Sequence, residues 1–353
     1  PFARLTADVT DGSRQLELAV QMAEGKKKHL LNGKPKRTAD LKGLVPSVTF
    51  TPDDLELAKG AMSVRRAALD ALGSQLSANH YLIRRDYEKV LRHKNRLLKD
   101  EAPAALVGAM NETLVTCGAQ LSCYRAALFE KLAASMASYY AEITDGHERL
   151  DAGFVPSWEE HDPLSFATRT FGRDEAREAL ADALARRGGE ERVRKRALVG
   201  PHADRIEFFI DGKNAALFGS QGQQRSVVLA FKLAEATLIQ DILRQKPVLL
   251  LDDVMSELDA ARRRALVAFI SGDIQTFITT TNLAYFDDDL LGGARIVELE
   301  KPRKTGEMPD EDRMFHVKHS PIDAQPARGE AEERDGQPSD PAEQPSARIE
   351  GDS

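Results

Sequence analysis

Two short segments carry polar residues at a spacing that suits nucleotide chemistry. The first is the polar turn Ser220-Gln221-Gly222-Gln223-Gln224-Arg225, which opens a helical pattern. In the second, about thirty residues later, the aliphatic run 248–251 ends in Asp252 and Asp253 and continues into Ser256-Glu257-Leu258-Asp259. A free helix N-terminus binds anions, and α/β sheets hold ligands at the carboxyl ends of their strands. Together the two segments predict half of a nucleotide-hydrolysing site.

Each segment has an expected role. Asp252 is placed to hold Mg²⁺, which prefers hard oxygen ligands and bridges nucleotide phosphates. Asp253 is placed to orient or deprotonate the attacking water. Ser220 is a helix cap, and Gly222 permits a close approach of phosphate. Taken alone, the second segment also fits a strand that ends by chance in a polar turn.

The other half of such a site is a phosphate-binding loop of the form G-x-x-x-x-G-K-[ST]. No segment of the 353 residues has this pattern. Because the first residue is Pro1 and not Met, we expect a lost N-terminal start. We also expect that these residues alone do not hydrolyse ATP.

Composition narrows the class of protein. Charged residues make up 30% of the chain and aromatic residues 6%, which is typical of a soluble, helix-rich protein. No apolar run approaches the ~20 residues that span a bilayer, and no secretory signal pattern is present. Cys117 and Cys123 lie on different faces of a helical pattern, which favours two reduced thiols. We therefore expect a cytoplasmic location and no membrane segment.

The net charge of −7 comes largely from one end of the chain. From Ser320 onward there are nine acidic residues, three basic residues and five prolines, with almost no large apolar side chains. Such a composition cannot bury enough surface to fold. It predicts a disordered acidic tail over 320–353, and the nearly neutral remainder does not argue against nucleic acid.

The hydrophobic pattern predicts β structure on both sides of a helical insert. Residues 1–62 read as an antiparallel β section, with turns at Asp11-Gly12 and Asn32-Gly33. Helical spacing without strand signals fills 63–189 and ends at Gly188-Gly189. The expected helices are 64–76, 78–98, 103–143 and 163–187, with caps at Ser63, Ser77 and Asp162.

After residue 190, strands and helices alternate, which implies parallel pairing in an α/β layer. The expected strands are 193–199, 206–210, 248–251 and 274–279, and the expected helices follow Ser220 and cover 260–270. The strand at 248–251 is a continuous aliphatic run, which suits burial on both faces of the sheet. A single α/β head over 1–62 and 190–319, interrupted by a helical arm over 63–189, explains this order.

Two basic clusters are candidates for phosphate contacts. One is the second hairpin, with Lys26, Lys27, Lys28, Lys34, Lys36 and Arg37. The other is the stretch 84–99, where the candidate DNA contacts are Lys89, Arg92, Lys94 and Arg96. Solvated surface charge is the alternative for both clusters, and on the hairpin it would also protect a sheet edge.

These motifs together resemble the RecF family of bacterial recombination and replication-repair ATPases, which are related to SMC and ABC ATPases. Ser220–Arg225 matches the family's signature motif, Val248–Asp253 its Walker B motif, and Ser256–Asp259 its D-loop. The block from Phe50 to Asp70 is distinctive of RecF and not of ABC transporters, and Phe315–Lys318 resembles the family's last strand. The resemblance covers about residues 1–320 and implies an ABC/SMC-type head with mixed and antiparallel sheets.

The chain departs from the RecF pattern in two places, and in a third place it shares with RecF a departure from many ABC ATPases. The Walker A loop, which RecF proteins carry near the N-terminus, is not among its residues. In Gly200-Pro201-His202-Ala203-Asp204-Arg205, Ala203 and Arg205 stand where a basic and an acidic residue are expected. Where many ABC ATPases have a switch histidine, Thr281 could sense a γ-phosphate; a threonine that only ends a strand is the alternative.

The resemblance implies an ATP- and Mg²⁺-dependent head-to-tail homodimer that binds single-stranded and double-stranded DNA near gaps. Walker A, Asp252 and Asp253 would serve a chain's own ATP, and Ser220–Arg225 the ATP of its neighbour, with Asp259 near the junction. The family works with RecR and RecO in recombinase loading, recombinational repair and the SOS response. Two alternatives stay open: a non-hydrolysing DNA-binding or scaffolding module without Walker A, and an ABC transport ATPase.

Overall fold

The computed structural model describes residues 2–10, 14–159, 170–271, 274–286 and 288–298. The chain divides into two units, 1–296 and 297–353, and all but the first two residues of the second unit lie outside the described ranges. The predictions for the Asp162 cap, the strand Phe315–Lys318 and the tail 320–353 fall on residues that are not described.

The N-terminal residues form an antiparallel sheet of order β1-β2-β3-β4. Two of its turns have positive φ at both central residues, Glu24 (51°) with Gly25 (76°) and Asn32 (50°) with Gly33 (73°). This is the backbone of a type I′ hairpin turn, so the predicted Asn32-Gly33 turn is confirmed, whereas the Glu24-Gly25 turn was not predicted. The antiparallel pairing predicted on either side of Asp11-Gly12 is present, but the turn itself lies outside the described residues. The strands are β1 (Phe2–Thr10), β2 (Gln15–Ala23), β3 (Lys26–Leu31) and β4 (Lys34–Lys36).

A three-stranded parallel sheet places the Walker B aspartates. Its order is β10-β9-β5, from β5 (Ser47–Phe50), β9 (Val248–Asp252) and β10 (Thr276–Thr279). The assignment of residues 48–50 to an antiparallel section was wrong. Val48 and Phe50 are buried in the core shared with helix α8 (Gln221–Leu243), and this burial pairs β5 with the aliphatic strand β9.

Strand β9 is buried on one face only, which corrects the prediction of burial on both. Leu249 and Leu251 are buried in the core with α8. The alternate residue Leu250 is 38% exposed, and its neighbour Phe277 on β10 is 54% exposed. The described residues therefore cover one side of this sheet more completely than the other.

A third sheet lies within and beyond the region predicted to be purely helical. It has the order β6-β7-β8, from β6 (Leu150–Val155), β7 (Arg205–Ile210) and β8 (Lys213–Asn214). The absence of strands over 63–189 was thus a wrong prediction. Leu150 and Phe154 of β6 pack in the same core as Ile206 and Phe208 of β7, so this strand forms through pairing with residues far along the chain.

The helices largely follow the predicted pattern. Ser77 caps α4 as expected, because its Oγ accepts the His80 N–H. Ser63 is not a cap, since α3 begins at Met62. The main helices are α3 (Met62–Leu76), α4 (Ala78–Lys99), α5 (Ala104–Ile143), α6 (Arg173–Arg194) and α10 (Ala260–Ile270). The short helices are α1 (Thr38–Leu41), η1 (Pro52–Asp54), α2 (Leu55–Lys59), η2 (Pro201–Ala203), α7 (Ala215–Phe218), α9 (Val254–Glu257), η3 (Leu283–Tyr285) and α11 (Asp288–Gly292).

Helix α6 corrects a predicted boundary. It runs through Gly188-Gly189 to Arg194, so neither the expected break there nor the strand 193–199 is present. A glycine inside a helix costs about 1 kcal/mol relative to alanine. Burial of Leu180 and Leu184, together with the buried ion pair that Glu191 makes with Lys94, offsets this cost.

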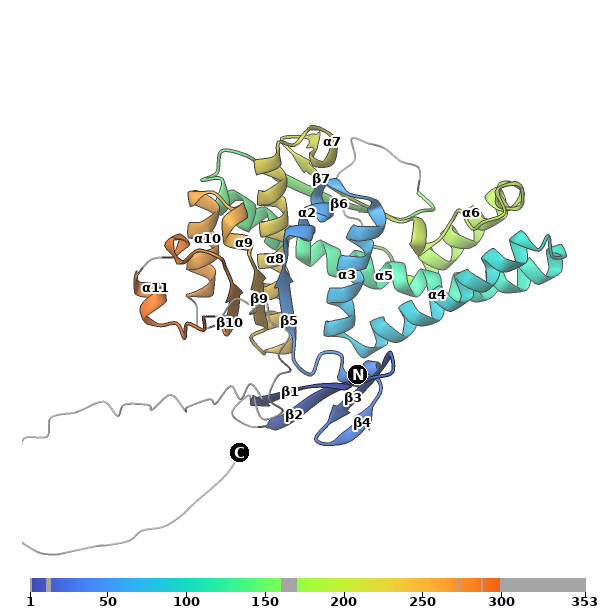
Figure 1. Ribbon diagram of the computed structural model, residues 1–353. Helices are drawn as coiled ribbons and strands as arrows, with labels where there is room; N and C mark the ends of the chain where they lie inside the picture. The colour runs from blue at the N-terminus through green and yellow to red at the C-terminus, as the bar shows by residue number, and fades with distance from the viewer. Residues whose placement is uncertain (1, 11–13, 160–169, 272–273, 287, 299–353) are drawn as a thin grey trace, which may run out of the picture. The chain divides into compact units, whose positions relative to one another are not determined.

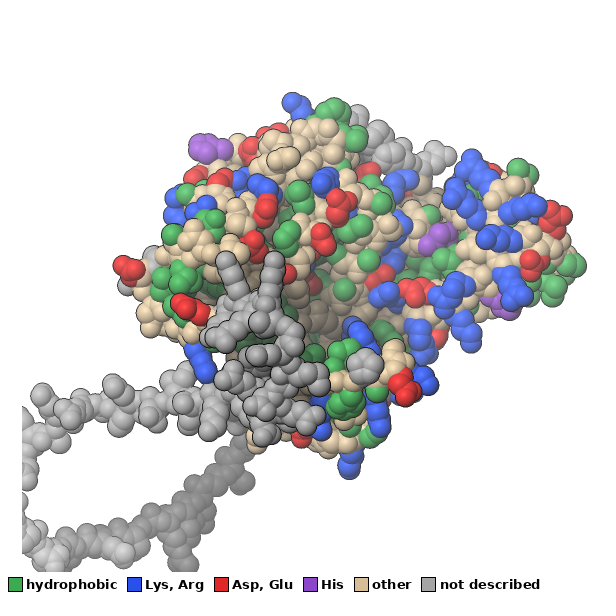
Figure 2. Space-filling model, viewed as in Figure 1, with side chains coloured by type: hydrophobic (Ala, Val, Ile, Leu, Met, Phe, Trp, Pro, Cys, Tyr) green, Lys and Arg blue, Asp and Glu red, His purple; other side chains and the backbone are tan. Residues whose placement is uncertain are grey.

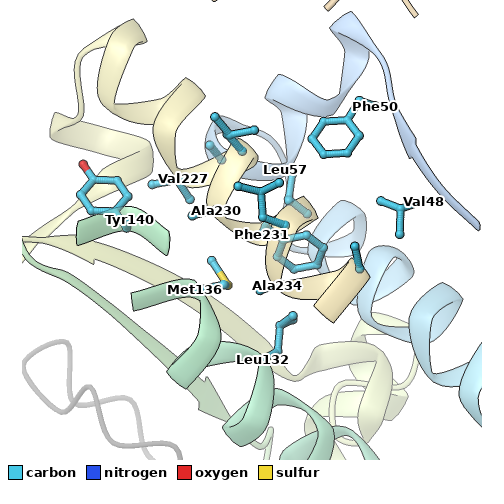
Figure 3. Close-up of a cluster of buried hydrophobic side chains, with 14 of the residues drawn as sticks. Val48, Phe50, Leu57, Leu132, Met136, Tyr140, Val227, Ala230, Phe231 and Ala234 are labelled. Atoms are coloured by element: carbon cyan, nitrogen blue, oxygen red, sulfur yellow. The ribbon is translucent and has the colours of Figure 1, made fainter. Parts of the chain in front are cut away.

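Two hydrophobic clusters share helix α5. One cluster joins α5 to α8, β5, β9 and the β6-β7 pair, and Figure 3 shows Met136 and Tyr140 of α5 beside Val227 and Phe231 of α8. The other joins α4, α5 and α6 through residues such as Tyr87, Leu121 and Leu180. In Figure 1, α4 and α6 lie at one end of the ribbon, and α5 runs from that end into the middle of the ribbon. From here on we call these three helices the arm. No helix in the described ranges is long and apolar enough to cross a bilayer.

Candidate nucleotide site

The signature turn is a helix N-terminus closed by a capping box. Oγ of Ser220 accepts the N–H of Gln223 at 3.2 Å, and Oε1 of Gln223 accepts the N–H of Ser220 at 2.8 Å. Helix α8 thus begins at Gln221, and the predicted Ser220 cap is confirmed. Ser220 and Gln221 are exposed, so the positive end of the helix dipole faces solvent, where it can meet an anion.

The remaining motif residues hold the turn in place. Gln223 donates from Nε2 to Oε1 of Glu148 at 2.9 Å. Gln224 is buried and donates to the carbonyl of Ala215 at 3.2 Å. The motif therefore divides into an exposed tip and a supporting set of side chains.

A close contact with Arg262 is a second reason for glycine at position 222, besides access for phosphate. The guanidinium of Arg262, in the first turn of α10, donates to the Gly222 carbonyl at 2.6 Å and to Oγ of Ser226 at 2.9 Å. A Cβ at Gly222 would lie 3.1 Å from a guanidinium nitrogen of Arg262. Sequence reasoning missed Arg262, because its contact with Gly222 crosses 40 residues.

The two aspartates of the Walker B segment meet Thr279 of the neighbouring strand. Oγ1 of Thr279 donates to Oδ1 of Asp252 at 2.6 Å, while the Asp253 N–H donates to the Thr279 carbonyl at 3.1 Å. Parallel pairing sets Thr279 directly beside Asp252. Thr279 was missed by sequence reasoning, although its place at the end of β10 was an available signal.

Asp253 sits at a strained turn between β9 and α9. Its φ of 49° is in the left-handed region, which non-glycine residues adopt at a cost and which is frequent at functional sites. Its Oδ1 is buried and has no hydrogen-bond partner among the described residues. An unpaired buried carboxylate oxygen is costly, and a ligand that donates to it would remove that cost.

The donor set fits Mg²⁺ bound together with nucleotide phosphates. Mg²⁺ is commonly held by one or two carboxylates plus phosphate oxygens and water, which Asp252 at the open end of β9 can provide. Within the described ranges no group of three or more His, Cys, Asp or Glu side chains is placed to hold a metal ion. The site therefore suits a metal brought by nucleotide better than a metal held by protein alone.

The D-loop is tied to the signature turn by two arginines. Arg225 makes an ion pair with Glu257, and Arg262 makes one with Asp259. Asp259 also caps α10 by accepting the Arg262 N–H at 3.0 Å, and Ser256 donates to the Asp253 carbonyl at 2.8 Å. The structure thus brings the three predicted segments together around one edge of the parallel sheet.

Beside this edge, Phe50, Asp54, Leu55, Arg225 and Glu257 help to line a pocket of about 60 Å³. Ligand pockets usually measure ~300 Å³ or more, so this pocket alone does not enclose a nucleotide. Thr281 is exposed beyond the end of β10, and its proposed role toward a γ-phosphate stays a prediction.

One of the candidate DNA contacts was wrong. Lys94 is fully buried and makes an ion pair with Glu191 at 2.7 Å, and burial lowers the pKa of its ammonium group. It cannot reach a phosphate from this position. Lys89, Arg92 and Arg96 are exposed.

The Gly200–Arg205 segment contains a buried ion pair that its sequence did not predict. Asp204 is fully buried, and its Oδ2 accepts from Ser122 at 3.0 Å and from Arg125 at 3.3 Å. Arg125 also pairs with Asp70 at 2.7 Å. Burial raises the pKa of Asp204. For Asp70, burial acts in the same direction, but hydrogen bonds from His80 and Arg125 hold its pKa below the usual value.

Comparison with curated proteins finds close similarity to one family. The chain is 35% identical over 301 residues to the DNA replication and repair protein RecF of Lactobacillus delbrueckii subsp. bulgaricus, covering 84% of this chain and 77% of the relative. It is 34% identical over 317 residues to RecF of Rippkaea orientalis, covering 85% and 81% of the two chains. No protein-family model matches the chain.

Solved structures give the same result. The recombination mediator protein RecF of the RecFOR pathway, solved as RecF-ATPrS, matches with a TM-score of 0.72 and 29% identity, over 81% of this chain and 76% of that one. The RecF-ATP structure matches with a TM-score of 0.71 over 80% and 75%. These findings confirm the fold class and the resemblance on which the sequence prediction depended, and the chain belongs to the RecF family.

Proposed function

We propose that this chain is a DNA replication and repair protein of RecF type that binds DNA as an ATP-dependent dimer. The observation that carries the proposal is the joint geometry at one sheet edge. There, a capped and exposed helix N-terminus is held by two arginines to the D-loop, which directly follows the two strand-end aspartates. The matching structures are of RecF-ATP and RecF-ATPrS, which supports a nucleotide as the ligand.

Within one subunit, Asp252 would hold Mg²⁺ and Asp253 would position the attacking water. Mg²⁺, when bound, supplies charge neutralisation for the phosphates. The Thr279 hydroxyl fixes the orientation of the Asp252 carboxylate by donating to it. Oδ1 of Asp253 is buried and has no hydrogen-bond partner within the described ranges, so it would accept from the attacking water if nucleotide binding opens this turn.

Across the dimer, Ser220 and the first turn of α8 would face the nucleotide of the neighbouring subunit. Ser220 and Gln221 are exposed, and the α8 N-terminus can supply backbone N–H groups to a γ-phosphate. A nucleotide shared in this way holds two subunits together, and hydrolysis releases them. Such a switch suits a DNA clamp better than a fast metabolic enzyme.

The arm offers the surface for DNA. Arg85, Lys89, Arg92, Arg96 and Lys99 recur along α4 at helical spacing and are all exposed. They share one face of the helix, over about 21 Å at 1.5 Å per residue. Figure 2 shows Lys and Arg side chains gathered over the end of the molecule where Figure 1 places α4 and α6.

We call this row the α4 stripe, and three of its cations are available for phosphate. Arg85 pairs with Asp86 of the same helix, and Arg96 pairs with Asp100 at the helix end. Lys89, Arg92 and Lys99 make no ion pair within the described part of the chain. We infer partnership with RecR and RecO in recombinational repair, and action in the SOS response, from family membership and from the RecFOR pathway in which the matching RecF structures act.

The test uses this chain preceded by the Walker A segment of a RecF relative, which we call the extended chain. We expect Ser220→Arg to abolish ATP-induced dimerisation, measured by light scattering, while ATP binding by the monomer stays nearly intact. The reason is that a bulky cation at the exposed cap blocks the approach of the partner. Ser138→Arg, the same change at an exposed position of α5, is the matched control and should dimerise normally.

Two results would count against the proposal. Dimers that persist with ATP in Ser220→Arg would remove the motif from the interface. An extended chain that binds ATP but stays monomeric under all nucleotide conditions would favour a DNA-binding module that does not use ATP for assembly.

A further inference from the structure

The side chain of Glu148 connects the signature turn to the long helix of the arm, although it belongs to none of the motifs. Its Oε1 accepts from Nε2 of Gln223 at 2.9 Å, and its Oε2 accepts from the hydroxyl of Tyr140 at 2.6 Å. Glu148 lies in the loop between α5 and β6, 75 residues from Gln223. One carboxylate therefore joins two separate elements.

Both ends of the side-chain amide of Gln223 make hydrogen bonds. Its Oε1 accepts the Ser220 N–H in the capping box, and its Nε2 donates to Glu148. Because an ionised carboxylate can only accept hydrogen bonds, Glu148 requires the NH₂ end of the amide to point toward it. The oxygen of the amide is then left for Ser220, so Glu148 fixes the orientation on which the cap depends.

Tyr140 carries this connection into helix α5. Tyr140 is buried in the last turn of α5, and burial followed by the Glu148 contact raises the pKa of its hydroxyl, which stays protonated as a donor. The same helix places Leu114 and Leu121 in the cluster of the arm. A continuous helix of 40 residues that is packed at both ends behaves as one rigid element, since packed interiors transmit displacement.

We propose that Glu148 is a positioning residue that orders the signature turn and links it, through Tyr140 and α5, to DNA bound on the arm. The inference rests on the proposed function, in which the turn faces a partner's nucleotide and the α4 stripe binds DNA. DNA that changes the position of α5 then changes the order of the turn. By linkage, a nucleotide held at the turn changes DNA affinity in return.

Hydrogen exchange of the 353-residue chain tests the positioning role. Glu148→Ala should raise the exchange rates of the Gln223 and Gln224 amides about fivefold to tenfold, because the loss of a hydrogen bond that fixes the cap increases local opening. Glu148→Gln has one acceptor oxygen for two donors, so it should give an intermediate rate. Glu142→Ala removes an exposed carboxylate from the last turn of α5 and is the matched control.

Addition of a 20-base-pair duplex tests the link. In the wild-type chain the two amides should change their exchange rates at least twofold when DNA binds. Tyr140→Phe keeps the Glu148–Gln223 contact but loses the connection to α5. Its amides should therefore not respond, while its DNA affinity stays within about twofold of wild type.

The outcomes separate the two claims. Unchanged Gln223 and Gln224 exchange in Glu148→Ala overturns the positioning role. DNA binding without a response at the turn in the wild type, or an equal response in Tyr140→Phe, overturns the link. If the duplex does not bind at all, the DNA surface of the proposed function fails and the link fails with it, whereas the Glu148→Ala result still decides the positioning role.

Discussion

Neutralising the α4 stripe should change the salt dependence of DNA binding. The perturbation is the double variant Lys89→Gln with Arg92→Gln. These two side chains are exposed and make no ion pair within the described ranges. Removing their charges should therefore remove the proposed DNA contacts without breaking an ion pair inside the protein.

The expected change in the salt dependence of DNA affinity follows from counterion release. Each duplex phosphate that is neutralised contributes about 0.9 to the slope of log affinity against log salt. Loss of two contacts should lower that slope by about 1.8. Between 50 and 200 mM salt, wild type should then lose affinity about twelvefold more than the double variant.

The assay is fluorescence anisotropy with a labelled duplex, titrated at several salt concentrations with the 353-residue chain. The matched control is Lys131→Gln with Arg264→Gln, which removes the same charge from exposed positions on α5 and α10. Lys94→Gln is unsuitable as a stripe variant, because it would leave Glu191 as a buried, unpaired charge.

The reasoning is refuted if the double variant keeps the affinity and the salt slope of wild type. If the control variant lowers the salt slope by the same amount, DNA affinity depends on the net charge of the protein and not on the row of cations on α4.

Three further predictions concern residues at the nucleotide site and beneath it. Burial raises the pKa of Glu235 to about 7, so the folded state holds a proton that the unfolded state releases from about pH 4.5 upward. Glu235 should therefore destabilise the fold by about 3 kcal/mol as pH rises from 4.5 to 7. Burial of His202, whose pKa is lowered to about 4, acts in the opposite direction, so the measurement is the difference in stability between wild type and Glu235→Gln in urea titrations at pH 5 to 8. A difference that does not change with pH would contradict the assignment. Gly222→Ala places a Cβ 3.1 Å from Arg262 and should weaken ATP-induced dimerisation of the extended chain about as much as Arg262→Gln does. The double variant should dimerise little worse than either single variant. Fully additive losses in light scattering would show that the two changes act separately. Asp253→Asn should slow ATP hydrolysis by the extended chain at least about a hundredfold and prolong its dimer, and unchanged turnover in a phosphate-release assay would remove Asp253 from catalysis.

Local patterns were enough for the features that depend on neighbours in sequence. The Ser220 cap, helix α8, helix α10 and the Asn32-Gly33 hairpin turn all formed where propensity and spacing placed them. Their bonds join residues a few positions apart, so the information needed is local. The burial of Lys94 could also have been predicted from local spacing. Lys94 comes nine residues after Arg85, which places it half a turn away from the α4 stripe, on the opposite face of the helix.

Features that depend on distant partners could not be found in this way. Strand β5 joined a parallel sheet because β9, about 200 residues later, offered an aliphatic neighbour. Strand β6 formed inside a helical region because β7 pairs with it. Helix α6 continued through two glycines because burial on α4 and α5 outweighs their low helix propensity.

The sequence by itself determined the family of this protein, since motif residues such as Ser220 and Asp252 and their spacing are enough to predict a RecF-type nucleotide site. Only the tertiary structure decided what holds those residues. Arg262 reaches Gly222, Glu148 reaches Gln223 and Thr279 reaches Asp252 across 27 to 75 residues of sequence. Such contacts depend on how helices and strands pack, and no local pattern along the chain records that packing.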